Sequence, residues 1–319
     1  MNKAPLSRLQ EDRHYAAYPC SGQRCARCRR ISQRVSALPE PGADCSAYED
    51  LARLNPDIPN IQNAVAFFHS HQPPDLPFEP KSFLVVAYPA SCAQIVVTAE
   101  GRRLAIPIPP TYLDDTPERQ RLRERLEQAA QGFQTAPCRG VSQKLLAVLS
   151  GLGRFGRNNI CYVGSWGSYV NLKAFYSDIP CADVSYPIRF MDACQACDLC
   201  RQNCPTGAIG AKTAIDAGRC LTLYNENDQP LPDWLPPAVH HALIGCLRCQ
   251  ACCPQNPPLP EKDIKTLECD AAESRDLLAA ATAAPGPELT AKLRQFGLHA
   301  FCIARAGRNA RLVIDANRP

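Results

Sequence analysis

Nine of the nineteen cysteines in this chain lie between positions 194 and 253, in two regularly spaced groups with one cysteine between them. In the first group, two residues separate Cys194, Cys197 and Cys200, and Cys204 follows after three more, directly before Pro205. Three thiolates at this spacing bind one [4Fe–4S] cluster, while the fourth cysteine reaches to a second cluster. The first group therefore predicts a partner motif elsewhere in the chain.

The second group supplies that partner motif in a shorter form. Its sequence is GCLRCQACCPQN, and a further cysteine lies in the loop between the two groups. If each group lends one ligand to the cluster of the other, eight thiolates hold two [4Fe–4S] clusters. Cluster one then takes Cys194, Cys197, Cys200 and Cys253, and cluster two takes Cys204, Cys220, Cys246 and Cys249.

The spacing alone leaves one ligand of cluster two open. Cys246, Cys249 and Cys252 would form a complete ferredoxin triplet, which would release Cys220 from a ligand role. Zinc is the alternative metal for the whole region, because four thiolates also suit a tetrahedral zinc ion. Zinc ribbons, however, use pairs of cysteines and need neither a third cysteine nor a Cys-Pro step. The spacing favours iron–sulfur clusters.

The N-terminal cysteines suggest a third metal site, on a weaker pattern. Cys20, Cys25 and Cys28, with Cys45 further on, resemble the spacing of a plant-type [2Fe–2S] site, although the fourth cysteine comes early. Six other cysteines are isolated, and we expect them to be small buried side chains. These six are Cys92, Cys138, Cys161, Cys181, Cys269 and Cys302.

Histidines offer two further pairs of metal donors, His69 with His71 and His240 with His241. Histidines of this kind are more often hydrogen-bonded parts of the scaffold than ligands, since the imidazole ring both donates and accepts. We expect the scaffold role for all four.

A glycine-rich stretch, GLGRFG, runs from Gly151 to Gly156 and has the spacing of a dinucleotide-binding loop. Such a loop must follow a strand and open a helix, whereas here the pattern predicts a helix before it and a strand after it. We therefore expect a tight turn, or backbone held close to some other flat ligand.

Charge and hydropathy exclude several classes of protein. The formal net charge of +4 and the pI of about 8.2 are too mild to require a nucleic-acid partner. No stretch approaches the roughly 18 apolar residues of a membrane span, and no apolar signal segment is visible, so we expect a cytoplasmic protein without a membrane partner. Arginines nevertheless gather at Arg24, Arg27, Arg29 and Arg30, and at Arg119, Arg121, Arg123 and Arg125.

The stretch before the cysteine module has the pattern of a mixed-sheet domain. Runs of β-branched and apolar residues predict strands, and the segment RRLAIPIPP reads as an edge strand because proline cannot donate to a ladder. The predicted strands are 82–89, 95–100, 102–110, 160–164 and 168–177, the last two joined by the turn GSWGS. The predicted helices are 47–54, 61–69, 116–131, 141–150, 272–284 and 288–297.

These elements predict a chain of the α+β or α/β class in four regions. Residues 1–78 are a poorly defined N-terminal region, and 79–189 form an α/β domain of cofactor-binding type. Residues 190–258 form a bacterial two-[4Fe–4S] ferredoxin-like domain, and 259–319 form a short helical C-terminal tail.

Five motifs, taken in order along the chain, resemble the epoxyqueuosine reductase family and its shorter double-cluster relatives. They are GLGRFGRNN, YSDIPC, CQACDLCRQNCPTGAI, RCLTLYNE and GCLRCQACCPQN, and the resemblance extends from about Phe83 to Pro257. It implies a cobalamin-binding α/β domain followed by a two-cluster ferredoxin domain, an arrangement that reductive dehalogenases share. In that family the clusters pass electrons to cobalt, which reduces an epoxide on a modified tRNA base.

The resemblance also implies roles for single residues and for partners. It places the loop residues Gly151, Gly153, Gly156 and Asn158 beside the corrin, and it makes Cys220 rather than Cys252 the fourth ligand of cluster two. It further implies an external low-potential electron donor of flavodoxin or ferredoxin type, and it makes tRNA a candidate substrate.

Three departures separate this chain from the longer members of that family. The family's catalytic aspartate lies in a Val-Asp-Ser/Thr-Ala-Pro stretch, whereas this chain has Gln134, Thr135, Ala136 and Pro137 and offers no acid there. A Tyr-Ala-x-Gly-x-Asp-Tyr-His stretch is missing before Thr116, and the tail replaces the helical repeats that grip tRNA. The match is to the shorter relatives, and the sequence identifies no catalytic residue.

Two functions follow from these patterns. The first is a reductase in which two low-potential clusters relay electrons to an active site, with cobalamin as the candidate cofactor and an unknown substrate. The second is a non-catalytic, ferredoxin-like electron carrier or partner subunit that has kept the scaffold and lost the acid.

Overall fold

The computed structural model divides by its contacts into two compact units, each built from two separate stretches of the chain. Unit 1 contains Met1–Pro89 and Pro117–Cys197, and unit 2 contains Ala90–Thr116 and Asp198–Pro319. The structure describes residues 32–37, 53, 73–113, 120, 122, 124, 132–181, 188–210, 215–228, 230–259, 263–280 and 284–318.

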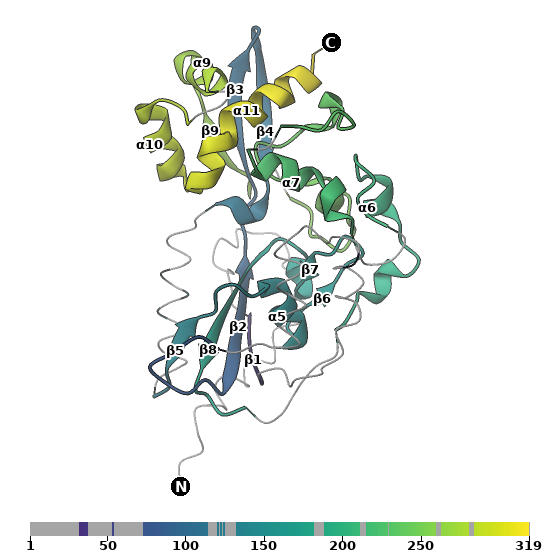
Figure 1. The fold of residues 1–319 in the computed structure, drawn as a ribbon. Coiled ribbons are helices and arrows are strands. Elements are labelled where there is room, and N and C mark those ends of the chain that lie inside the picture. The colour runs from purple at the N-terminus through teal and green to yellow at the C-terminus, as the bar shows by residue number, and fades with distance from the viewer. Residues whose placement is uncertain are drawn as a thin grey trace. The chain divides into compact units, whose positions relative to one another are not determined.

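Unit 1 is organised around an antiparallel sheet with the strand order β1-β2-β8-β5 (Figure 1). Strand β2 is central, and seven of its eight residues are buried, because the sequence SFLVVAYP carries apolar side chains toward both faces. Strand β8 pairs with β2 in antiparallel orientation along its whole length, from Ser82 opposite Ser177 to Pro89 opposite Val170. The four strands are β1 (Ser32–Ala37), β2 (Ser82–Pro89), β8 (Val170–Ser177) and β5 (Thr135–Pro137).

Helix α5 (Gln143–Leu149) packs on this sheet, against β2 and β8. Ser142 caps the helix by accepting a hydrogen bond from the Leu145 N–H. The helix buries Leu145, Leu146 and Val148, which explains why the run KLLAVL predicts a helix correctly. The glycine-rich stretch follows directly.

A small hairpin, β6 (Arg154–Phe155) with β7 (Cys161–Tyr162), follows α5. The sequence predicts a strand at 160–164, which contains β7, joined through the turn GSWGS to a strand at 168–177, which contains β8. The turn contains the 3₁₀ helix η3 (Gly164–Trp166), but β7 pairs with β6 and β8 pairs with β2 and β5. The two neighbouring strands therefore belong to different sheets.

Unit 2 contains a three-stranded sheet with the order β4-β3-β9. Strands β3 (Ala93–Ala99) and β4 (Arg102–Ile108) form the predicted antiparallel pair, and β4 is the predicted edge strand within this sheet. Strand β9 (Lys265–Glu268) pairs with β3 in parallel. This strand was not predicted, and it lies in the region expected to be a helical tail.

Three helices, α9, α10 and α11, cover this sheet and share one apolar core with it (Figure 1). Asp270 and Glu273 form a reciprocal capping box at the start of α9. In the core, Ile95 and Ile106 of the sheet pack with Leu293 and Ile303 of the helices. The helices are α9 (Ala271–Ala279), α10 (Pro287–Phe296) and α11 (Ala300–Ala316).

Short helices carry the cysteine module and its surroundings. Within unit 2 they are α6 (Leu199–Gln202), η5 (Ala217–Arg219), α7 (Leu221–Glu226), η6 (Pro237–Val239) and α8 (Arg248–Ala251), together with η2 (Pro110–Tyr112) before the module. The helix η4 (Asp192–Cys194) belongs to unit 1. Helices α6 and α8 pack on each other, as expected for two related cysteine motifs.

The mixed α and β composition confirms the predicted fold class. Gln120, Leu122 and Glu124 are helical, as predicted, and Leu122 packs on β2; the rest of that helix lies outside the described residues. The predicted helices at 47–54 and 61–69 also lie outside the described residues, apart from helical Arg53. No helix in the described part of the chain is long and apolar enough to cross a membrane.

Candidate metal centre

Four cysteines of unit 2 lie at the ends of its short helices. Cys204 follows α6, Cys220 is the N-cap of α7, Cys246 precedes α8 and Cys249 lies within α8. These are the four predicted ligands of cluster two. Local hydrogen bonds shape each turn, such as those from the Cys220 N–H to the Ala217 carbonyl and from the Leu223 N–H to the Cys220 carbonyl.

Burial and the neighbouring cysteines both affect the pKa values of the thiols of Cys246 and Cys249. Burial raises the pKa of the Cys246 thiol to about 12, and that of the Cys249 thiol well above its usual value. The sulfurs of Cys204 and Cys220 raise both values further. Electrostatic effects of this kind weaken with distance, so Cys204 and Cys220 lie in the neighbourhood of Cys246 and Cys249.

Hydrogen bonds favour the thiolate at two of these positions, although burial opposes it. Burial raises the pKa of the Cys220 thiol, while hydrogen bonds from Thr222 lower it. A backbone hydrogen bond from Arg248 likewise lowers the pKa of the Cys246 thiol. A bound metal makes thiols give up their protons. The site therefore has donors ready for negatively charged sulfur.

Cys252 is the alternative ligand that the spacing offers. Its thiol points at the Cys249 carbonyl, with 3.8 Å between sulfur and oxygen. Cys249, three positions earlier, is instead affected by Cys246, Cys220, Cys200 and Cys204. The choice of Cys220 over Cys252 as the fourth ligand of cluster two stays a prediction.

Helix α11 holds together the two segments that carry Cys220 and Cys246. The buried Asn309 amide donates to the carbonyl oxygens of Asn225, in α7, and of Leu243, at 2.9 Å each. The Asn225 side chain in turn donates to the Gly245 carbonyl at 2.8 Å. The C-terminal tail therefore supports the segments that carry two predicted ligands.

Tyr112 makes a second bridge between the same two segments. Its hydroxyl hydrogen-bonds the carboxylate of Glu226, at the end of α7, and its ring lies against Gly245. Gly245 has a φ of +59°, and a Cβ there would collide with the Tyr112 side chain. Burial raises the pKa of both Tyr112 and Glu226, so the pair stays protonated more readily than usual.

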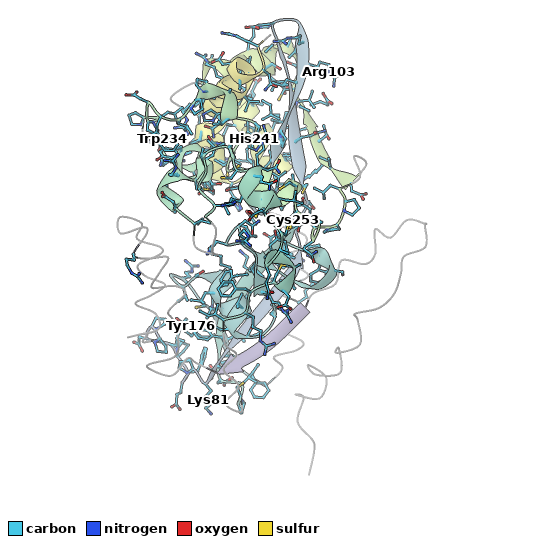
Figure 2. All side chains as sticks on the ribbon, turned by 90° about the vertical axis from the view of Figure 1, so that its right-hand side faces the viewer. Lys81, Arg103, Tyr176, Trp234, His241 and Cys253 are labelled. Atoms are coloured by element: carbon cyan, nitrogen blue, oxygen red, sulfur yellow. The ribbon has the colours of Figure 1, made fainter. Side chains whose placement is uncertain are left out.

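The histidines of this region are scaffold, as predicted. His240 is buried and its Nδ1 lies 3.2 Å from the Asn225 side-chain oxygen, while His241 contacts the Val239 carbonyl through Nδ1 at 3.0 Å. Burial lowers the pKa of His240 to about 4. The Nε2 of His241, which is labelled in Figure 2, faces the Leu247 N–H and the Cys246 sulfur, so this ring borders the candidate centre. His69 and His71 lie outside the described residues.

In unit 1, the loop that carries Cys194 and Cys197 is held by Arg157 of the glycine-rich stretch. The Arg157 guanidinium donates from Nε to the Cys197 carbonyl at 3.0 Å and from Nη2 to the Cys194 carbonyl. The Arg157 backbone N–H lies 3.5 Å from the Cys194 sulfur and donates to it. The sequence singled out the glycines of this stretch and missed the arginine; the GRNN run was the available signal.

The glycines of this stretch face their own chain. A Cβ at Gly153 would collide with the Cys161 sulfur, and one at Gly156 would come within 2.6 Å of the Tyr162 ring. Gly151 has a φ of +72°, which suits glycine at the turn after α5. Close packing in the hairpin therefore explains why glycine stands at these positions.

The predicted cofactor-binding role of Gly151, Gly153, Gly156 and Asn158 gains no support from this geometry. Asn158 is buried, and its amide donates to the Tyr162 hydroxyl while its oxygen accepts from the Ile160 N–H. The three glycines have no side chain that could hold a cobalamin, and the Asn158 side chain is engaged within the hairpin, so the role of these residues stays a prediction. We assign no chemical step to cobalamin.

A carboxylate does lie beside the stretch that lacks the expected acid. Strand β5 pairs with β8, and the Gln134 N–H donates to Asp178, which follows β8, at 2.7 Å. The segment after β8 thus places the Asp178 carboxylate beside Gln134, although the stretch Gln134–Pro137 contains no acid.

The isolated cysteines are buried, as predicted, with one exception. Burial raises the pKa of Cys92, Cys161 and Cys302 to about 12, so these thiols stay neutral. Cys138 and Cys269 are also buried, whereas Cys181 is partly exposed. Cys20, Cys25, Cys28 and Cys45 lie outside the described residues, and the third metal site stays a prediction. Within the described ranges, no three acidic, cysteine or histidine side chains converge on a single metal ion.

Comparison with known proteins identifies the cysteine module. Residues 193–256 match the family model of the 4Fe-4S double cluster binding domain. This match contains every predicted cluster ligand, so the chain carries a domain for two [4Fe–4S] clusters and the zinc alternative is wrong.

Several curated proteins are similar to part of the chain. It is 32% identical over 116 residues to the epoxyqueuosine reductase of Bacillus subtilis, which is 36% of this chain and 29% of that protein. It is 33% identical over 117 residues to the Escherichia coli enzyme, covering 36% and 30%. The matched stretch thus spans less than a third of these relatives. An uncharacterised protein of Geobacillus stearothermophilus is 35% identical over 91 residues, covering 28% and 41%.

Solved structures show the same fold over most of the chain. Epoxyqueuosine reductase from Bacillus subtilis superposes with a TM-score of 0.58 at 19% identity, covering 89% of this chain and 77% of that one. An epoxyqueuosine reductase solved with a modified tRNA stem loop gives a TM-score of 0.59 at 19% identity, with the same coverage. The predicted resemblance is confirmed for the fold and for the double-cluster domain.

Proposed function

We propose that this protein is an iron–sulfur reductase that relays electrons, one at a time, through two [4Fe–4S] clusters to an acceptor. The observation that carries the proposal is the group of four partly buried cysteines inside a double-cluster domain. Thiolate-bound clusters of this type work at low potential, which suits reduction of a difficult substrate.

The proposed ligands follow the crossed assignment. Cluster two is held by the group in unit 2, and the electrostatic contacts of Cys220 with Cys204, Cys246 and Cys249 support it over Cys252 as the fourth ligand. The full sets are Cys194, Cys197, Cys200 and Cys253 for cluster one, and Cys204, Cys220, Cys246 and Cys249 for cluster two.

The chain's own residues prepare cluster two for a charged ligand set. Burial makes the free thiolates unfavourable, so iron must replace the protons as the cluster binds. Asn309 and Tyr112 hold the segments of Cys220 and Cys246 in place, which limits movement of the sulfurs when an electron arrives. A rigid, partly dry site favours fast electron transfer because little needs to rearrange.

The acceptor, donor and substrate belong to this proposal as well. Cobalamin is the candidate acceptor and tRNA the candidate substrate, on the similarity to reductases of which one was solved with a tRNA stem loop. The proposed donor is a low-potential protein of flavodoxin or ferredoxin type. A cytoplasmic setting suits the fifteen described cysteines, all of which are free thiols.

An electron carrier without an active site is the second candidate. Two observations favour it: the Gln134–Pro137 stretch has no acid of its own, and the glycines of the loop pack against their own hairpin. A carrier needs the clusters alone.

Anaerobic reconstitution with iron and sulfide, followed by incubation with cobalamin and gel filtration, tests both candidates. Two clusters predict about eight iron and eight acid-labile sulfide atoms per chain. For the reductase we expect a corrin spectrum that co-elutes with the protein, and formation of cob(I)alamin after reduction with dithionite.

The results separate the two functions. Eight irons without retained corrin would contradict the cobalamin-linked reductase and favour the carrier. Protein that contains zinc and no sulfide would overturn both candidates.

A further inference from the structure

Arg157 is the residue through which the glycine-rich hairpin contacts the first cysteine loop. Its side chain is half-buried, and it donates to the carbonyls of Cys194, Gln195 and Cys197 while its backbone N–H donates to the Cys194 sulfur. One residue thus places a full positive charge and several N–H groups around the loop that carries two predicted ligands of cluster one.

The hairpin fixes Arg157 in this position through contacts on either side of it. The Phe155 N–H donates to the Arg189 carbonyl at 2.8 Å, and the Met191 N–H donates back to the Phe155 carbonyl at 2.9 Å. The rings of Phe155 and Phe190 also lie 6.2 Å apart. Backbone hydrogen bonds therefore join the hairpin to the segment just before Cys194.

Lys144 of α5 fixes the other side of the loop. Its ammonium donates to the Asn159 carbonyl at 2.9 Å and to the Asn159 side chain. Asn159 has a φ of +59°, a conformation in which a residue other than glycine needs such support. Arg157 is therefore held between two anchored positions, Phe155 and Asn159.

We propose that Arg157 raises the reduction potential of cluster one. Reduction adds one electron to the cluster and its thiolates and breaks no bond, so the reduced state carries one more negative charge. A nearby cation and N–H donors aimed at a ligand sulfur stabilise that charge and shift the potential upward. This inference rests on the proposed function, because it takes Cys194 and Cys197 as ligands of cluster one.

The fixed geometry separates Arg157 from an ordinary surface arginine. Its side chain donates to three backbone carbonyls of the cysteine loop, and its backbone N–H donates to the sulfur of a predicted cluster ligand. Arg154 of the same hairpin is the contrasting case, because it forms an exposed ion pair with Asp192 at 2.9 Å. An exposed pair of this kind contributes little.

The test is a redox titration of the reconstituted full chain, with dithionite as reductant and the two cluster signals followed by electron paramagnetic resonance. In Arg157→Gln we expect one midpoint potential to fall by about 59 mV, a tenfold change in the equilibrium for one electron, and the other to stay in place. Arg157→Lys keeps the charge but loses the fork of donors, and we expect a smaller shift.

Arg154→Gln is the matched control, since it removes an arginine three positions away that touches no cysteine in the described contacts. Both potentials should match the parent protein in this variant. Iron content is measured in every sample, so that a lost cluster is distinguished from a shifted one.

Two results would overturn the inference. One is an Arg157→Gln protein with full iron and both potentials unchanged. The other is an Arg157→Gln protein that loses half its iron while Arg157→Lys keeps all of it at unshifted potentials, which would make the role purely structural. Parent protein without clusters would instead contradict the proposed function.

Discussion

The two cysteine loops receive the same kind of hydrogen bond from different places. At Cys246 the donor is the backbone of Arg248, two positions further along the same motif. At Cys194 the donor is the backbone of Arg157, which lies 37 positions earlier in a separate hairpin. The second motif therefore organises its own first sulfur, whereas the first motif depends on a distant element.

The supports of the two loops differ in the same way. In unit 2 the segments that carry Cys220 and Cys246 are tied to helix α11 by uncharged, buried amides such as Asn309 and Asn225. In unit 1 the support of the Cys194 loop is a guanidinium on backbone carbonyls. A neutral support fixes geometry, while a charged one also acts on the energy of an added electron.

Removal of Cys249 should give the largest effect and identify the ligands of cluster two. We expect Cys249→Ser to hold about four irons instead of about eight, because one cubane loses a thiolate. Iron and acid-labile sulfide analysis measures this. Cys252→Ser is the matched control three positions away and should keep all eight; a loss of iron there, with full content in Cys220→Ser, would reverse the proposed assignment.

Asn309→Leu tests the neutral support in unit 2. The change leaves the buried carbonyls of Asn225 and Leu243 without their donor, which costs about 3 kcal/mol of the free energy of unfolding. Chemical denaturation of the reconstituted protein measures the loss. Asn317→Ala, near the end of α11, removes only a bond to the Val313 carbonyl and should cost less than about 0.5 kcal/mol. Equal effects of the two changes would contradict the bracing role of Asn309.

Gly153→Ala tests the hairpin that carries Arg157. The added methyl group collides with the Cys161 sulfur and lies 2.9 Å from the Tyr162 carbonyl, so we expect a loss of about 2 kcal/mol in the free energy of unfolding. Gly218→Ala, where the nearest atom is 3.3 Å away on a side chain, should be nearly neutral. If Gly153→Ala were as stable as the parent, the space beside Gly153 would be open to a ligand after all.

His240 gives unit 2 a pH dependence of its own. Its pKa is lowered to about 4 by burial in the folded state, against an ordinary value of 6.5, so the unfolded chain binds more protons below pH 7. Stability should therefore fall as the pH drops, by about 1 kcal/mol between pH 7 and 5.5. Denaturation at both pH values measures this change, and His240→Asn should lack this part of the loss. An unchanged pH dependence in that variant would show that other groups cause it.

Much of the fold was predictable because strong local patterns coincide with the elements. The run SFLVVAYP forms β2, QKLLAVL forms α5, and the segment RRLAIPI forms an edge strand. The strand β9 was not predictable, because the short polar sequence KTLE becomes a strand only by pairing with β3, some 170 positions earlier. Strand β1 has a similar dependence on β2.

The sequence by itself predicted the chemistry of the cysteine module, since the spacing of Cys194, Cys197, Cys200 and Cys204 favours iron–sulfur clusters over zinc. Only the tertiary structure decided which distant segments lie beside its cysteines. Cys220 lies near Cys249 at the start of helix α7, and Arg157 reaches Cys194 because a hairpin folds back on its loop. The spacing of residues along a chain reflects contacts within one turn or motif. Contacts between distant segments leave no local pattern in the sequence.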